Sequence, residues 1–175
     1  MDGEKFLVKL SGSFGASGGE YKLHGLLEEY FGELVDEIKG DRMGNFCGIK
    51  RGSGRGGLKV MIAAHADEVA LAVKNIDKRG FLHFVPVGGV DPKTLPGQEV
   101  IIHGERDIYG VIGIASYSEH PKKQGPDKAV ENENMIIDAG CTYDQLSGVV
   151  LPGDFITIKA EAIRLLDDYV TGKAM

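Results

Sequence analysis

The sequence predicts an α/β fold joined to a β-rich region, and three patterns support this. Apolar residues recur at helical spacing between residues 18 and 39, and a short apolar run at 59–64 follows a glycine-rich loop. Beyond residue 70, glycine and proline separate several short apolar runs. The first two patterns are typical of a helix packed on a buried strand, and the third is typical of a small barrel or sandwich.

The expected helix spans residues 18–39. Ser17 and Glu20 have the S-x-x-E spacing of a capping box, and Gly40 is a stop signal. The opposite helix face is acidic, which is typical of a solvated surface. The apolar stripe that would face the sheet consists of Leu23, Leu26, Leu27, Tyr30, Phe31, Leu34, Val35 and Ile38.

The run 59–64 is predicted to be a buried strand that ends at a polar cluster, His65-Ala66-Asp67-Glu68. Open α/β sheets place their sites at such strand ends. His65 and Asp67 are two residues apart, so extended geometry would direct both side chains to one face. That arrangement suits a metal-binding imidazole with a carboxylate that fixes its orientation. The alternative is that His65 caps the strand and that the two acidic residues are solvated loop charges.

The region after residue 70 is predicted to form a small β-barrel or sandwich. Its strand candidates are the runs 81–85, 99–103, 108–114 and 155–159. Thr142 and Gln145 have capping-box spacing and predict a helical turn.

Charge and cysteine content limit the classes of function. With 20 basic and 26 acidic residues the net charge is -6, which argues against nucleic acid or an anionic membrane as the main partner. Cys47 and Cys141 form no CxxC unit, so we expect a reduced chain. Neither a signal peptide nor a membrane-length apolar stretch is evident, so a cytoplasmic location is expected.

Several ordered motifs resemble one enzyme family over nearly the whole chain. The run 60–69 resembles the metal-binding strand of the tetrahedral, TET-type metallo-aminopeptidases, which include glutamyl and deblocking aminopeptidases. The motifs at 14–18 and 41–45 resemble that family upstream of the strand. Those downstream, in the family's order, are 80–82, 87–89, 95–98, 110–113, 137–140 and 153–154.

This resemblance implies a site with two divalent metals, zinc or cobalt, and peptides as substrates. It assigns His65 as a metal ligand and Asp67 as the catalytic-site carboxylate that orients it. The residues 169–175 resemble the segment that leads to the metal-bridging aspartate, and the sequence stops just before that position. The later family ligands and general base have no counterpart, so the chain is expected to be a truncated and inactive aminopeptidase.

The resemblance also implies the domain organisation. Residues 1–70 and 164–175 would form an incomplete α/β metallo-aminopeptidase catalytic domain, and residues 71–163 an inserted, PDZ-like β-barrel domain that mediates homo-oligomer contacts. A non-catalytic assembly or interaction module is the alternative function. The remaining histidines, His24, His83, His103 and His120, have no metal-type spacing and are interpreted as surface or structural residues.

Overall fold

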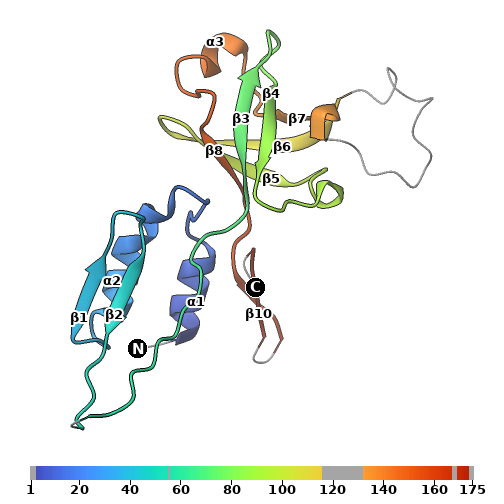
Figure 1. Ribbon diagram of the computed structural model, residues 1–175. Helices are drawn as coiled ribbons and strands as arrows, with labels where there is room; N and C mark the ends of the chain where they lie inside the picture. The colour runs from blue at the N-terminus through green and yellow to red at the C-terminus, as the bar shows by residue number, and fades with distance from the viewer. Residues whose placement is uncertain (1–2, 55, 116–131, 167–168, 174–175) are drawn as a thin grey trace. The chain divides into compact units, whose positions relative to one another are not determined.

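A computed structural model describes residues 3–54, 56–115, 132–166 and 169–173 of the chain (Figure 1). The chain divides into two compact units. The helical unit comprises Met1–Glu68 and Glu161–Met175, and the barrel unit comprises Val69–Ala160. Within the described ranges, no helix has the length and apolar character needed to cross a membrane.

The helical unit combines short helices with two small hairpins. Its helices are α1 (Gly3–Ser11), η1 (Glu20–Leu23) and α2 (His24–Phe31). Strands β1 (Glu37–Gly40) and β2 (Phe46–Ile49) form one antiparallel hairpin, and β9 (Ile163–Arg164) and β10 (Val170–Thr171) form another. Aromatic rings connect α1, α2 and β2. The ring centroids of Phe6 and Tyr30 are 4.6 Å apart, and those of Phe31 and Phe46 are 5.7 Å apart.

The predicted helix over 18–39 is wrong beyond Phe31. The chain turns after α2, and the backbone N–H of Asp36 donates to Ile49 O at 2.8 Å, which starts the pairing of β1 with β2. Ile38 therefore lies in β1, and Val35 lies in the connection that precedes this strand. Hairpin pairing with β2 prevails at Ile38, because this β-branched residue fits a pleated strand better than a helix.

The predicted capping box at Ser17 is also wrong. The residue before η1 is Gly19, and no side chain caps this helix. Glu20 instead accepts a hydrogen bond from the backbone N–H of Gly18 at 2.9 Å. The Ser17 hydroxyl donates to Asp67, a residue far along the chain.

The motif at residues 41–45 forms the turn between β1 and β2. The Asp41 carboxylate accepts hydrogen bonds from the backbone N–H groups of Met43 at 2.8 Å and Asn45 at 3.0 Å, and from the Asn45 side chain at 2.7 Å. These contacts, led by that of the Asn45 side chain, lower the pKa of Asp41. The motif thus connects two strands.

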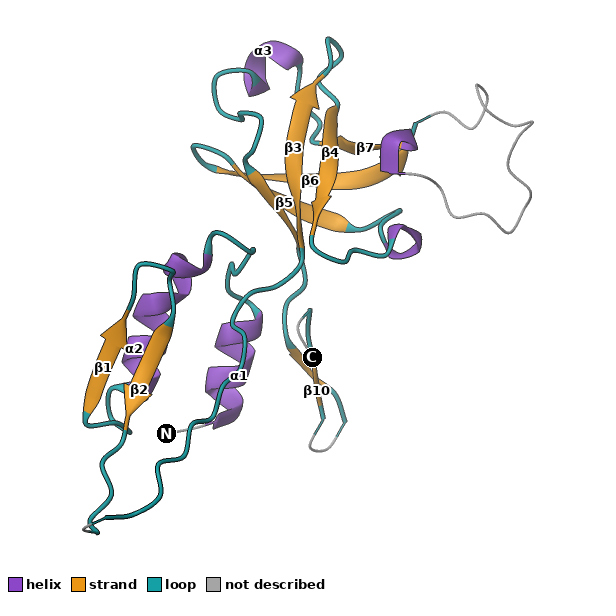
Figure 2. Cartoon of the chain, viewed as in Figure 1, coloured by secondary structure: helices purple, strands orange, loops and turns teal. Residues whose placement is uncertain are grey.

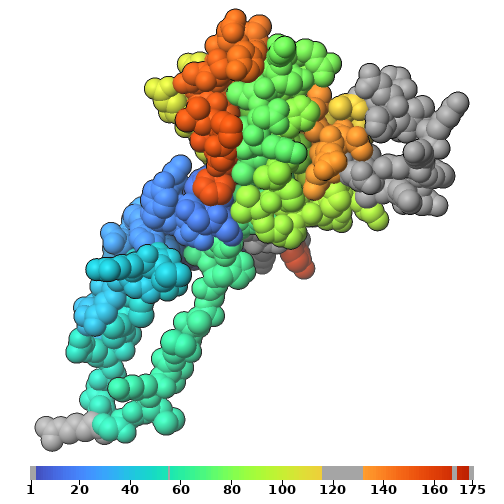
Figure 3. All heavy atoms as spheres, turned by 45° about the horizontal axis from the view of Figure 1, so that its top comes forward, coloured from blue at the N-terminus to red at the C-terminus, as the bar shows by residue number. Residues whose placement is uncertain are grey.

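The predicted buried strand at 59–64 is wrong. These residues form neither helix nor strand and are exposed, with Val60 at 82% and Ile62 at 94% exposure. Figure 3 shows the chain after β2 standing clear of other atoms over much of its length. A strand requires a hydrogen-bonded neighbour, and in the described part of the chain β1 and β2 pair only with each other. Residues 58–66 are called the arm below.

The barrel unit confirms the predicted small β-barrel. Six antiparallel strands close in the order β3-β4-β7-β6-β5-β8 (Figures 1 and 2). They are β3 (Ala70–Ile76), β4 (Leu82–Val87), β5 (Glu99–His103), β6 (Asp107–Ile114), β7 (Met135–Asp138) and β8 (Phe155–Ile158). The short helices are η2 (Pro92–Thr94), η3 (Asn132–Asn134) and α3 (Tyr143–Leu146), and α3 has the predicted Thr142–Gln145 capping box.

Apolar burial is concentrated in the barrel. Its core contains fully buried side chains from all six strands, among them Leu71, Leu82, Val100, Ile112, Ile137 and Ile156. In the described part of the helical unit, only Ala16, Leu23 and Leu27 are buried hydrophobic residues. Because apolar burial drives folding, the barrel holds most of the hydrophobic stabilisation of this chain.

The turn between β3 and β4 generates the first prediction. Gly80 has φ +93°, and an added Cβ would lie 2.1 Å from the Cys141 carbonyl oxygen, whereas Gly97 has φ +84° with open space around it. Both Gly80→Ala and Gly97→Ala should cost about 1–2 kcal/mol for the left-handed backbone. Gly80→Ala should cost roughly 1–3 kcal/mol more because of the backbone clash. Urea denaturation would measure the difference, and equal losses for the two variants would contradict this packing.

Candidate functional site

The candidate site lies at the end of the arm, in residues 65–68 of the helical unit. Glu68 forms a parallel β-bridge with Ala16, and its backbone N–H donates to Gly15 O at 2.7 Å. The Glu68 carboxylate accepts from the Gly15 N–H at 3.2 Å and from Lys173 Nζ at 2.7 Å. These contacts hold Glu68, just after the arm, against Gly15 near the N-terminus and Lys173 near the C-terminus.

The Glu68–Lys173 ion pair is largely shielded from water, because the two side chains are 16% and 9% exposed. A shielded ion pair is held mainly by its mutual attraction and its additional hydrogen bonds. Glu68 is therefore a structural anchor in this arrangement.

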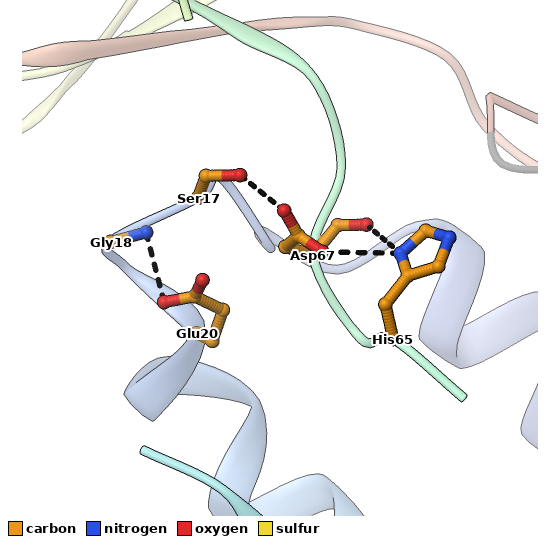
Figure 4. A network of polar contacts seen from close by, with 5 residues as sticks. All are labelled: Ser17, Gly18, Glu20, His65 and Asp67. Carbon is orange, nitrogen blue, oxygen red and sulfur yellow. Dashed lines mark hydrogen bonds and ion pairs between the residues drawn. The ribbon is translucent and has the colours of Figure 1, made fainter. Parts of the chain in front are cut away.

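His65 and Asp67 lie together, as their spacing predicts. Nδ1 of His65 is 3.1 Å from Asp67 Oδ1 and 3.0 Å from the Asp67 carbonyl oxygen (Figure 4). The imidazole is 86% exposed, and no hydrogen bond to its Nε2 is found among the described residues. Two acceptors at Nδ1 favour the tautomer with the proton there, which leaves the Nε2 lone pair available to a metal.

The second oxygen of Asp67 accepts a hydrogen bond from the Ser17 hydroxyl (Figure 4). This hydrogen bond, and next the contact with His65, lowers the pKa of Asp67. Asp67 is thus ionised at neutral pH and held between a hydroxyl and an imidazole. An ionised carboxylate on Nδ1 fixes the ring orientation.

The other histidines in the described ranges take no part in this cluster. His24 Nε2 is 2.9 Å from Gly44 O. His103 lies between Asp107 Oδ1 and Thr157 Oγ1, each at 2.9 Å, but Thr157 is buried, so this row of polar groups is structural. His83 lies on β4, and His120 lies outside the described residues.

The donor set is small. Among the described residues, no three His, Cys, Asp or Glu side chains converge to hold a metal ion. Cys47 and Cys141 form no disulfide in this structure. The His65–Asp67 pair fits one metal ligand with its orienting carboxylate, whereas a zinc hydrolase site uses about three protein ligands.

The sequence interpretation missed Ser17 and Lys173 as members of the site. Ser17 is 50 residues from Asp67, and Lys173 is 105 residues from Glu68. Spacing rules describe neighbours in one element, so no local signal could pair these residues.

The titration of Asp67 generates the second prediction. Its pKa is lower in the folded chain than in the unfolded chain, so the stabilisation is present at neutral pH and is lost as the pH falls through the folded value, below the ordinary value of about 3.9. Ser17→Ala should raise the pKa of Asp67 toward the ordinary value. NMR titration of the carboxyl carbons would measure this shift.

Asp41 is the internal control for that titration, because its pKa is lowered by Asn45 rather than by Ser17. Its titration should be the same in both proteins. An Asp67 curve that Ser17→Ala leaves unmoved would show that the hydroxyl does not hold the carboxylate.

Comparisons with known proteins agree on one enzyme family. The sequence profile described as M42 glutamyl aminopeptidase matches residues 44–175. A lysyl aminopeptidase of Pyrococcus furiosus is 34% identical over 142 residues, which cover 79% of this chain and 40% of that protein. The chain spans about half the length, or less, of the curated relatives that it matches.

Solved structures with related sequences have the same fold. An aminopeptidase from the archaeon Desulfurococcus kamchatkensis superposes with a TM-score of 0.86 at 32% identity, over 97% of this chain and 46% of that chain. The TET1 peptidase of Pyrococcus horikoshii, which can assemble into a tetrahedron or a large octahedral shell, superposes with a TM-score of 0.75 at 26% identity, over 95% of this chain and 49% of that chain.

Proposed function

Since the chain belongs to the M42 glutamyl aminopeptidase family, we propose that it supplies one metal ligand and its orienting carboxylate to a metal-dependent aminopeptidase site. His65 is the ligand through Nε2, and Asp67 is the orienting group. The observation that carries this proposal is the position of Asp67 on Nδ1, with Nε2 exposed.

Each polar group has its own role in this proposal. Asp67 keeps the proton on Nδ1, Ser17 fixes the Asp67 carboxylate, and Glu68 is neutralised by Lys173 and so is not the general base. When bound, zinc or cobalt would polarise the scissile carbonyl and lower the pKa of a bound water.

The remaining ligands and the general base must come from outside the described residues, because only one ligand position is evident within them. Hydrolysis of peptides from the amino terminus is therefore our proposal for the whole protein. We propose that the 175-residue chain has no such activity by itself.

The barrel has a separate role in the proposal. We propose that it is an inserted, PDZ-like domain that mediates contacts between copies, since the TET1 relative assembles into large shells. This is also the basis of the second candidate function, an assembly module without catalysis. Self-association would accompany either function, whereas metal binding at His65 belongs only to the first.

Metal binding generates the third prediction. Zinc added to the 15N-labelled chain should perturb the His65 ring signal with weak affinity, because a single imidazole competes poorly with water and buffer. His65→Ala should abolish this perturbation, and the matched His83→Ala should preserve it. Aminoacyl-p-nitroanilides should show no turnover with zinc or cobalt.

Three outcomes have clear meanings for this proposal. Stoichiometric, submicromolar binding that survives His65→Ala would overturn the ligand assignment. Turnover that disappears in His65→Ala would overturn the proposed inactivity while supporting the ligand. A chain that self-associates in light scattering but shows no zinc response at His65 would favour the assembly module.

A further inference from the structure

The barrel unit contains a hollow of about 750 Å³ beside β4. Its volume lies in the range of ligand pockets. Its apolar walls include Val85 and Pro86 of β4 and Pro92 of η2. Its polar lining includes Asn132 and Glu133 of η3 and Lys74 of β3. None of these residues belongs to the helical unit.

One wall of the hollow is an open strand edge. β3 pairs with β4 from Leu82 to Val87, but among the described residues β7 pairs with β4 only at Leu82. Among the described residues, no backbone hydrogen bond reaches residues 83–87 from the β7 side. An antiparallel strand directs backbone N–H and C=O groups to both sides, so this edge can pair with another extended chain.

The wall formed by η3 contains an acceptor without a donor. Asn132 Oδ1 is buried and has no hydrogen-bond partner within the described structure. A buried acceptor left unpaired is costly, and a ligand that provides an N–H group would remove this cost. Within the described residues, the hollow therefore combines an unpaired backbone edge and an acceptor without a donor between apolar walls.

We propose that this hollow binds an extended peptide, which adds to β4 as a short strand. Its backbone pairs with the β4 edge, and one of its N–H groups donates to Asn132 Oδ1. An apolar side chain of the peptide lies among Val85, Pro86 and Pro92. Because Lys74 and Glu133 place charges of both signs around the hollow, peptides with both an acidic and a basic residue are favoured.

The edge favours a separate peptide over the sheet of a second copy of the chain. Pro86 has no N–H group, and a register shift between Val73 and Asn75 in β3 distorts the neighbouring ladder. Both features hinder long edge-to-edge pairing of sheets. A short, flexible peptide can pair with the few residues that remain.

Binding of a blocked peptide to the full 15N-labelled chain tests this inference. The probe is an acetylated and amidated peptide of alternating valine and threonine, with one glutamate and one lysine. Amide shifts should concentrate at residues 83–87 and at the Asn132 side chain. The same peptide with N-methyl groups on alternate residues should not bind, because it cannot complete the strand pairing.

Two pairs of variants make the test specific. Val85→Lys should weaken binding roughly five- to tenfold by placing a charge on the apolar wall, whereas Val111→Lys on β6 should not; the two valines are 42% and 46% exposed. Asn132→Leu should weaken binding about fivefold through loss of the acceptor, and Asn132→Asp, which keeps an acceptor, should retain it. If Asn132→Leu fails to fold, the comparison of Val85→Lys with Val111→Lys alone tests the inference.

Several results would overturn the inference. One is equal affinity for the N-methylated peptide, and another is an equal loss in Val85→Lys and Val111→Lys. Absence of shifts at about 1 mM peptide would also overturn it. So would a dimer in light scattering that Val85→Lys dissociates, because the occupant would then be a second copy. His65→Ala should leave peptide binding unchanged, so the metal proposal can fail separately.

Discussion

The candidate site depends on the anchoring of Glu68. Its backbone bridges to Ala16, and its carboxylate binds both the Gly15 N–H and Lys173. One residue thus connects the loop after α1, the end of the arm and the C-terminal hairpin. This anchor lies next to Asp67, which is held at Ser17 and contacts the imidazole of His65. The geometry of the candidate ligand therefore depends in part on a largely shielded ion pair.

Two features of the helical unit have no partners among its described residues: the apolar side chains of the arm and the ligand position at His65. The arm exposes consecutive apolar residues, although each buried Å² of apolar surface is worth about 25 cal/mol. The donor set around His65 contains one ligand position among the described residues. Additional polypeptide that paired with the arm and provided acidic groups would satisfy both needs. That the matched relatives are about twice as long, or longer, agrees with this interpretation.

The sequence was most informative where a segment's partners are near in the chain. β5 was predicted correctly because alternating residues of Glu99–His103 face the core and its partner β6 follows directly in the chain. The arm was predicted incorrectly because its apolar character indicates burial but cannot show whether a partner strand is present. The long helix was predicted incorrectly because Val35 and Ile38 continue the helical spacing, and spacing alone did not reveal the turn after α2. Ser17 and Lys173 could not be placed because their partners are remote in sequence.

The central claim is that the arm is an extended apolar segment with no strand partner among the described residues. Hydrogen exchange of the backbone amides, followed residue by residue in the full chain, tests it most directly. We predict that residues 58–64 exchange at nearly the rates of an unstructured peptide, while the amides of β5 and β6 are strongly protected. Protection of the arm comparable to that of the barrel strands would contradict the account, because it would require a hydrogen-bonded partner that the described structure does not contain.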